Sequence, residues 1–267
     1  MIREPVVSGQ FYPQNVPELK KAIEEFKPKE SAKSSAYGLI LPHAGYVYSG
    51  RVAVTTVSKV IAKKRIIILG PNHTGYGEDF GMYPEGSWKT PFANLSIDSN
   101  LAQRILESGT DITRDTLAHK FEHSIEVELP ILYYFFGSFS FVPIVCNVSA
   151  LATYEKVAAQ IFSAVRADKE EILFVASSDM THYEPDSTAR RKDRDALTHI
   201  INLDAEGLVK TVKKENISMC GIAPVAILLL IMKKIGANKA NVSLYETSAD
   251  SGADASSVVG YAGVIIS

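Results

Sequence analysis

The segment RIIILGPNHTG, residues 65–75, contains the pattern that decides the fold and the first sign of a functional site. Residues 65–69 contain the short apolar run IIIL, which is typical of a strand buried on both faces of a sheet. The run ends in Gly70 and Pro71, residue types that begin loops, and His73 follows two positions later. The segment therefore predicts a central strand whose carboxyl end leads into a loop carrying an imidazole.

Two further segments repeat this arrangement of a buried strand followed by histidine. The apolar residues 37–41 are followed by His43, and residues 172–176 are followed by Asp179 and His182. In open α/β sheets, ligands bind beyond the carboxyl ends of the strands. Three strand ends that carry imidazoles therefore indicate one shared site.

Helix and strand patterns alternate along the rest of the chain. Helices are expected over residues 49–62, 99–108, 121–136, 153–165, 189–202, 205–214 and 222–235, and further strands over 139–145, 242–247 and 258–266. Such alternation is typical of a largely parallel sheet covered by helices on both faces. We therefore expect an α/β fold, a single three-layer α/β/α domain over residues 1–267 with a central, largely parallel mixed sheet.

Composition and charge exclude several classes of protein. The 267 residues are 46% hydrophobic and 22% charged, with a formal net charge of -2, which fits a globular chain with a large core. A near-neutral balance provides no electrostatic attraction to nucleic acid or to an anionic membrane. The longest apolar run, 222–232, is too short to span a bilayer. Because the chain starts without a signal-peptide pattern, we expect a cytoplasmic protein whose two cysteines stay reduced.

The polar residues near these strand ends each allow a functional and a structural interpretation. Asp179 is close enough to hydrogen-bond His182, which would fix the imidazole tautomer and raise its basicity. Asp179 could equally cap a helix that carries His182 in its first turn, and the two interpretations are compatible. His123 either faces the cleft or caps a helix, whereas His119 and His199 are expected to be exposed and without a role.

The cysteines differ in their surroundings. Cys220 precedes an expected helix, whose dipole favours the thiolate form that binds metal or attacks carbon. Its alternative interpretation, a small buried hydrophobe, is the one we prefer for Cys146.

Two imidazoles with a carboxylate or a thiolate suffice to hold a divalent metal ion with open coordination positions. A carboxylate suits Fe(II), whereas a thiolate shifts the preference toward Zn or Cu(I). No CxxC or HExxH spacing occurs, so the metal prediction rests on separate loops converging. One alternative is a metal-free hydrolase with Cys220 as nucleophile, His182 as base and Asp179 as orienting carboxylate. Another is a non-enzymatic module that binds a peptide or partner in the cleft.

Taken together, these segments resemble the Memo family. The matching motifs are SGQFYP at 8–13, PHAGYVYSG at 42–50, LGPNHTG at 69–75, FEHSIEVELP at 121–130, SSDMTH at 177–182 and CGIAP at 220–224. The resemblance runs nearly end to end and implies a fold similar to that of the class III extradiol dioxygenases.

The resemblance also implies roles for individual residues. It implies that His43 and His73 are metal ligands, with Cys220 at the position of the dioxygenase carboxylate. His182 corresponds to the catalytic base, and Asp179 accompanies it. The implied cofactor is a divalent metal ion, first Fe(II), with Cu or Zn as alternatives.

Ligands and partners are also implied. The ligand groove of a eukaryotic relative uses an aromatic residue and a tyrosine that correspond to Phe11 and Tyr48, and we expect His123 to join them. That relative is described as a signalling adaptor and as a metal-binding redox protein, while prokaryotic members are associated with radical-SAM and AMMECR-type proteins. We therefore expect a metal-binding, dioxygenase-like protein that acts in oxidation or redox chemistry on a small organic substrate.

Overall fold

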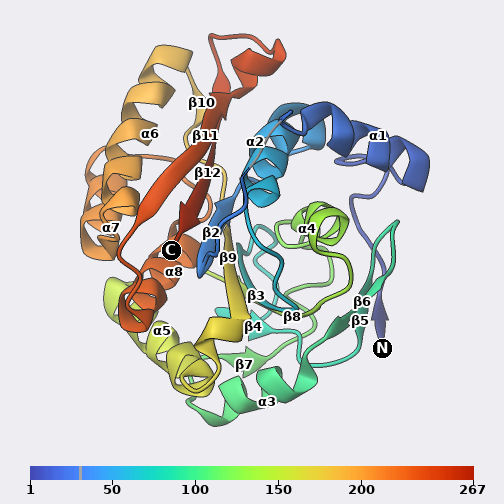
Figure 1. The fold of residues 1–267 in the computed structure, drawn as a ribbon. Helices are drawn as coiled ribbons and strands as arrows, with labels where there is room; N and C mark the ends of the chain where they lie inside the picture. The colour runs from blue at the N-terminus through green and yellow to red at the C-terminus, as the bar shows by residue number, and fades with distance from the viewer. Residues whose placement is uncertain (30–31) are drawn as a thin grey trace.

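The sheet that positions the site is built around five parallel strands. The computed structural model describes residues 1–29 and 32–267, and these residues form a sheet of twelve strands (Figure 1). The parallel strands lie in the order β6 (Asn94–Ile97), β8 (Ser140–Cys146), β3 (Arg65–Pro71), β9 (Ile172–Ser177) and β2 (Gly38–Leu41). Each neighbouring pair in this series is parallel, so all five carboxyl ends meet at the same edge of the sheet.

Shorter and antiparallel strands extend this parallel centre and make the sheet mixed. They are β1 (Ile2–Arg3), β4 (Phe80–Met82), β5 (Ser87–Lys89), β7 (Thr113–Arg114), β10 (His182–Glu184), β11 (Ala240–Thr247) and β12 (Val258–Ile266). β12 runs antiparallel to β2, β10 and β11. On the other side, β5 runs antiparallel to β6 and parallel to β1, while β4 runs antiparallel to β8 and parallel to β7.

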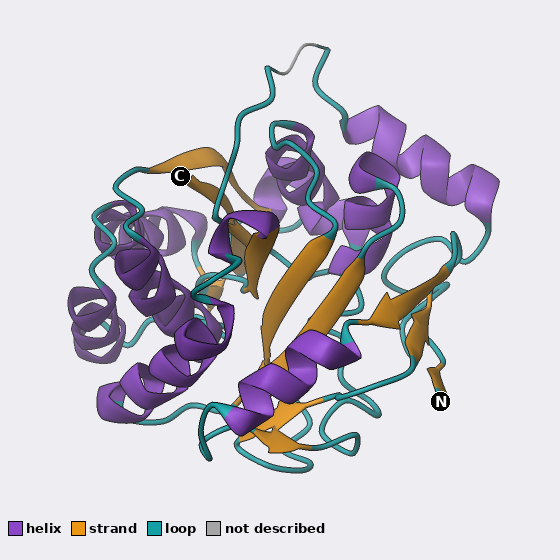
Figure 2. Cartoon of the chain, turned by 60° about the horizontal axis from the view of Figure 1, so that its bottom comes forward, coloured by secondary structure: helices purple, strands orange, loops and turns teal. Residues whose placement is uncertain are grey.

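Helices cover both faces of the sheet, which gives three layers (Figures 1 and 2). They are α1 (Val16–Phe26), α2 (Tyr46–Ser58), α3 (Ser99–Glu107), α4 (Glu128–Phe136), α5 (Leu151–Val165), α6 (Asp186–Ile201), α7 (Ala205–Lys214) and α8 (Ile222–Ile235). One buried cluster joins α3, α5, α6, α7 and α8 to one face, and a second joins α1, α2 and α4 to the other. The expected α/β/α architecture is confirmed.

The centre of strand β3 shows why residues 66–69 are continuously apolar. Ile67 and Leu69 belong to one buried cluster, whereas Ile66 and Ile68 belong to the other, and none of the four has exposed surface. Burial of each such side chain stabilises the fold by about 1.5–3 kcal/mol. At these four positions, which are covered on both faces, no polar side chain would reach water.

Most expected elements are present within a few residues of their predicted bounds, but the helix expected over 121–136 is confirmed only over Glu128–Phe136. Helix α4 begins only at Glu128, because residues 121–127 fold mainly as turns. In this stretch the buried carboxylates of Glu122 and Glu126 accept backbone hydrogen bonds from the loop after β3 and from the N-terminal segment. Helix α1 and the short strands β1, β4 to β7 and β10 are additional to those expected.

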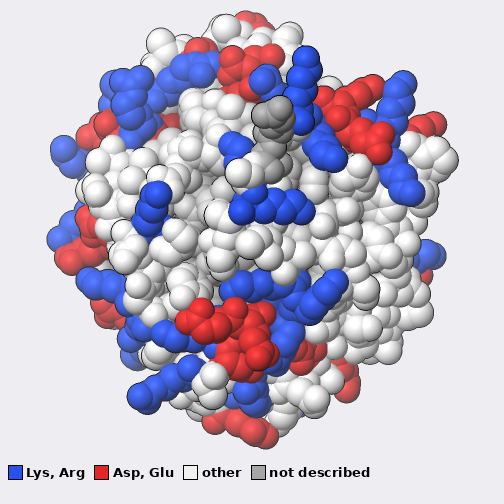
Figure 3. All heavy atoms as spheres, in the orientation of Figure 1, with Lys and Arg blue, Asp and Glu red and all other residues white. Residues whose placement is uncertain are grey.

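Charges of both signs are spread over the surface. On the face drawn in Figure 3, Lys and Arg side chains are interspersed with Asp and Glu, and neither sign forms a broad field. None of the helices formed by the described residues combines the length and apolar character that a membrane crossing requires.

Candidate metal centre

Three neighbouring parallel strands bring the histidine-bearing loops together. β9 lies between β2 and β3, and the chain leaves these strands toward Asp179, His43 and His73 respectively. The turn before α8 adds Cys220, whose Sγ accepts a hydrogen bond from the backbone N–H of Asp179 at 3.2 Å. The expected convergence of these segments at one edge of the sheet is confirmed, whereas the chemical roles of their side chains stay predictions.

The spacing of His43, His73 and Cys220 fits a metal ion. One ligand atom from each of the three lies within 4.8 Å of the other two. Nε2 of His43 lies 3.5 Å from Sγ of Cys220. Nitrogen and sulfur ligands bound at ~2.0–2.3 Å around a tetrahedral ion are roughly 3.3–3.7 Å apart. Three protein ligands at such spacing leave a coordination position for a substrate or water.

The imidazole of His43 is oriented from behind by Ser177. The two side chains share a hydrogen bond of 2.7 Å between Nδ1 and Oγ, and the Ser177 hydroxyl also lies within hydrogen-bond distance of the Ser124 carbonyl and a Glu128 carboxyl oxygen. If Nδ1 of His43 donates its proton to Ser177, Nε2 of the same ring has a free lone pair that points toward Cys220. Burial, with the nearby His73, lowers the pKa of His43 well below its usual value, which favours the neutral ring that metals bind.

His73 is oriented by a carboxylate that the sequence analysis does not assign to the site. Its Nδ1 lies 2.9 Å from Oε1 of Glu122, which leaves Nε2 available. Burial alone would raise the pKa of Glu122, but the hydrogen bond and charge of His73 lower it to about 2. Burial likewise opposes protonation of His73, yet the Glu122 carboxylate raises the pKa of this imidazole. A histidine ligand held by a carboxylate is a recurrent arrangement behind bound metals.

The thiol of Cys220 differs from the sequence-based expectation. Burial, together with the neighbouring Asp179 carboxylate, raises the pKa of Cys220, so the thiolate is not favoured by the helix dipole alone. Cys220 precedes Gly221, the N-cap residue of helix α8, so its thiol lies outside the first turn of the helix whose dipole was expected to favour the thiolate. A bound cation would supply the missing positive charge, because a coordinating thiol is deprotonated by the metal itself.

His182 is oriented by carbonyl oxygens, and the expectation that Asp179 holds its ring is wrong. Nδ1 of His182 lies 2.8 Å from the Met180 carbonyl oxygen and 2.9 Å from that of Ser218, so Nδ1 carries the proton. The Asp179 carboxylate instead accepts the backbone N–H of His43 at 2.9 Å, and burial raises the pKa of Asp179 to about 6. A helix capped by Asp179 is also excluded, because strand β10 begins at His182.

Two other sets of three side chains have the spacing of metal ligands, but in one of them the carboxylate already binds other groups of the protein. Glu122, grouped with His73 and His123, already accepts hydrogen bonds from four N–H donors. A carboxylate so fully bonded stabilises a loop and has little capacity left for an ion. The group of Asp179, His182 and Cys220 shares its thiol with the first set, so both surround one centre.

A pocket of about 510 Å³ opens over this centre. All three residues expected to bind a ligand, Phe11, Tyr48 and His123, line it together with His43, His73, Asp179 and His182. The ring of Phe11 packs edge-on against that of His123, with centroids 5.0 Å apart. Cys220 is not among the lining residues, but its Sγ lies 3.5 Å from Nε2 of His43, which is. The three residues therefore lie around one pocket, and their role in binding a ligand stays a prediction.

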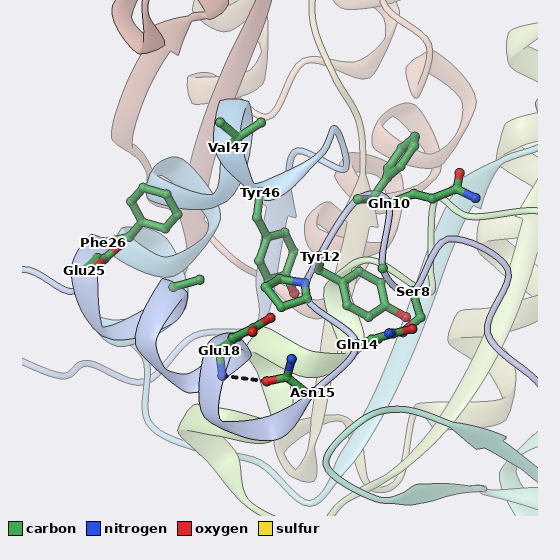
Figure 4. A pocket seen from close by; sticks show the side chains of 14 residues that line it. Ser8, Gln10, Tyr12, Gln14, Asn15, Glu18, Glu25, Phe26, Tyr46 and Val47 are labelled. Carbon is green, nitrogen blue, oxygen red and sulfur yellow. Dashed lines mark hydrogen bonds between the residues drawn. The ribbon is translucent and has the colours of Figure 1, made fainter.

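A second hollow adjoins the pocket on the far side of the N-terminal segment. Gln10, Phe11 and Val47 line both, while Asn15 and Glu18 line only the second (Figure 4). The dashed bond in Figure 4 joins the Asn15 side chain to the backbone N–H of Glu18 and begins helix α1. Residues 8–15 therefore form a wall between the two hollows.

The structure also corrects the two histidines expected to be exposed. His119 is fully buried, lies 2.9 Å from the Gly81 carbonyl through Nε2, and packs against Trp88. His199 is half-buried and hydrogen-bonded to Asp204. Neither lies in the pocket.

Glu122 and Ser177 are the orienting residues that sequence reasoning missed. Each lies in a motif that also contains a histidine or an aspartate of the site, and this position is a signal that could have identified them.

Comparisons with known proteins identify the family and the fold of the chain. A family model described as "Memo-like protein" matches residues 3–265. The chain is 39% identical to a MEMO1 family protein of Methanopyrus kandleri, with 99% of each chain covered. It is 40% identical to one of Thermoplasma volcanium, covering 99% of this chain and 98% of that one. An uncharacterized Escherichia coli K12 protein, JW3007, shares the fold at a TM-score of 0.58 and 17% identity, covering 85% of this chain and 98% of that chain. The chain therefore belongs to the family of Memo-like proteins.

Proposed function

We propose that the protein binds one divalent metal ion through His43, His73 and Cys220, and that it oxidises a small organic molecule. Fe(II) is the first candidate and Cu is an alternative. Zn fits the same ligands, but it has no redox chemistry and would not support the oxidation. The observation that supports this most directly is that ligand atoms from three distant segments lie within 4.8 Å of one another.

The chain's own residues would perform the proton chemistry. A bound iron or copper would supply electron transfer and activation of oxygen. His182, whose Nδ1 is held by two carbonyl oxygens, presents Nε2 as a base that takes a proton from a substrate hydroxyl. The loop residues Ser177 and Glu122 hold His43 and His73 in position.

The metal-free hydrolase is less well supported. The imidazole nitrogen within hydrogen-bond distance of the Cys220 thiol belongs to His43, not to His182. Burial lowers the pKa of His43 and raises that of Cys220, so proton transfer from the thiol to this ring is doubly unfavourable. A binding module for a peptide, and association with radical-SAM or AMMECR-type proteins, stay predictions of the family resemblance.

Metal stoichiometry of protein purified without a histidine tag tests the proposal. We expect about one ion per chain in the wild type, and loss of that ion in His43→Ala and Cys220→Ala, because two remaining ligands hold a divalent ion poorly. Cys146→Ala is the matched control, since Cys146 is buried in the core and should leave metal content unchanged.

His182→Ala separates the base from the ligands. This variant should retain its ion while turnover, followed as oxygen consumption with catechols, falls about 10²–10⁴-fold. Loss of metal equal to that in His43→Ala would make His182 a ligand. A wild type that binds no metal under any loading condition would overturn the proposal as a whole.

A further inference from the structure

Glu128, the first residue of α4, is a buried carboxyl group that lacks the partners of two other buried glutamates before it in the chain. Glu122, Glu126 and Glu128 are all at most 2% exposed. Glu122 and Glu126 each accept hydrogen bonds from several N–H groups. In the described part of the chain the Glu128 carboxyl has a single partner: its Oε1 lies 3.0 Å from the Ser177 hydroxyl, and no donor reaches its buried Oε2. A charged carboxylate in this state would be unfavourable, because burial without compensating bonds penalises the charge.

The hydroxyl of Ser177 determines which of its neighbours carry a hydrogen. A serine hydroxyl donates one hydrogen and accepts at two lone pairs. The Ser177 Oγ lies 2.7 Å from the carbonyl oxygen of Ser124, 2.7 Å from Nδ1 of His43 and 3.0 Å from Oε1 of Glu128. Because a carbonyl oxygen can only accept, the serine hydrogen points to Ser124. His43 and Glu128 then face the two lone pairs, so each of them must bring its own hydrogen.

This arrangement assigns a hydrogen to each of the two groups. His43 donates through Nδ1, which leaves the lone pair of Nε2 free toward Cys220. Glu128 donates as a carboxylic acid, and its unpaired Oε2 is then an uncharged carbonyl oxygen. Burial raises the pKa of Glu128 well above its usual value, and the charge of Asp179 acts in the same direction. The environment of Glu128 therefore favours the acid form that the geometry requires.

We propose that Glu128 is a positioning residue of the metal centre that works as a neutral carboxylic acid. Its O–H group holds the hydroxyl of Ser177, and Ser177 holds the ring of His43 with Nε2 toward the centre. This inference rests on the proposed function, because the ring that is positioned is a proposed metal ligand. The second histidine ligand, His73, is held by the ionised Glu122, so the two rings are fixed by groups of different charge.

Infrared spectroscopy of the metal-free protein at neutral pH tests the charge of Glu128. The wild-type spectrum minus that of Glu128→Gln should contain the carbonyl band of a protonated carboxylic acid, which is separate from the bands of a carboxylate. Glu155→Gln, at an exposed position of α5, is the matched control, and its difference spectrum should contain carboxylate bands only. Carboxylate bands in place of the acid band in the Glu128 difference would overturn the inference.

Affinity for Zn(II), measured by competition with a chelator, tests the positioning. Zn(II) fits the proposed ligands and is not oxidised by air. Glu128→Gln keeps an uncharged donor toward Ser177 and should bind Zn(II) as tightly as the wild type. Glu128→Leu is similar in size but has no donor, so it should bind about threefold to tenfold more weakly, the loss of one net hydrogen bond. The same amide exchange at Glu122 removes a charge and should weaken binding about 10–100-fold.

Two affinity results would overturn the role of Glu128. One is a loss in Glu128→Gln as large as that in Glu122→Gln, because Glu128 would then act through its charge. The other is a folded Glu128→Leu variant that binds Zn(II) as tightly as the wild type. If circular dichroism shows that Glu128→Leu does not fold, the Gln variant and the infrared spectrum decide. Wild type that binds no Zn(II) but shows the acid band would refute the proposed function alone, whereas wild type that binds Zn(II) without showing this band would refute this inference alone.

Discussion

At the residue scale, the two histidine ligands of the candidate centre depend on neighbouring side chains that fix the orientation of their rings. Glu122 is the clearest case, because one carboxylate binds both the ring and the backbone of His73 and also closes the turn at His123. Such a neighbour fixes the tautomer and increases the basicity of the ligand. The affinity for metal therefore depends on a residue that does not touch it.

Replacement of Glu122 by Gln tests this dependence. The amide keeps an acceptor oxygen but loses the charge, so metal affinity should fall about 10–100-fold while the fold persists. Competition with a chelator of known affinity gives the measurement. Glu155→Gln, on an exposed face of α5, controls for the loss of one negative charge. Equal affinities in the two variants would contradict the role of Glu122.

At the element scale, the N-terminal segment is attached to the turns before α4 by a buried carboxylate. Glu126 accepts hydrogen bonds from the Arg3 guanidinium at 2.8 Å, from two backbone N–H groups of the segment, and from the Tyr12 hydroxyl. Because Phe11 belongs to the same segment, this attachment also positions one wall of the pocket.

Removal of this attachment should destabilise the whole protein. Glu126→Ala leaves the buried Arg3 without its counter-charge, and the free energy of unfolding should fall by about 3–5 kcal/mol. Urea denaturation gives the value. Glu4→Ala breaks only an exposed pair with Lys89 and should cost less than ~1 kcal/mol. Similar small losses in both variants would show that Glu126 does not stabilise the segment.

A second contact between elements, the ion pairs of Asp168, makes the free energy of unfolding depend on pH in the acid range. Asp168 pairs with Arg65 of β3 at 2.6 Å and with Arg104 of α3 at 2.8 Å. Partial burial would raise the pKa of Asp168, but the hydrogen bonds and charges of these arginines lower it. A lowered carboxyl pKa stabilises the fold above the unfolded value of ~3.9 and loses that contribution as pH falls through the folded value.

Asp168→Asn should therefore reduce the free energy of unfolding by roughly 0.5–1.5 kcal/mol at neutral pH, after allowance for screening by solvent. The difference from the wild type should be constant between about pH 5 and 8 and should shrink below about pH 4. Urea denaturation across this range is the measurement. Asp111→Asn, whose side chain makes no ion pair in the described part of the chain, is the control. A difference that grows on acidification would contradict the prediction.

At the scale of the whole molecule, the sheet joins both helical layers, and we expect residues 1–267 to unfold as one unit. Trp88 is the single tryptophan and lies buried on β5, far along the strand order from β9. Its fluorescence and the far-ultraviolet circular dichroism should therefore lose their native signals at the same urea concentration.

Phe174→Ala, at the centre of β9, should shift both transitions together by about 3–5 kcal/mol. Val148→Ala, at a highly exposed position, should shift neither by more than about 0.5 kcal/mol. Separate transitions for the two signals would show that the chain contains more than one folding unit.

Local patterns in the sequence determined the layers of the fold and the membership of the site. Continuous apolar runs identify β3 and β9, because a strand covered on both faces has no wet position. The loops after these strands place His73 and His182 at one edge, since parallel strands end on the same side. A signal for α1 was also available, with Asn15 as its cap and Leu19 and Ile23 four residues apart on its buried face.

Only the tertiary structure decided which groups hold the site residues and how readily they ionise. His182 is held by carbonyl oxygens, one of them from Ser218, 36 positions away, and the thiol of Cys220 is made a weaker acid by burial. The turns before α4 replace the first part of the expected helix because Glu126 bonds a segment 120 positions away. Desolvation and hydrogen bonds to distant parts of the chain set these properties, and neither is a function of local spacing.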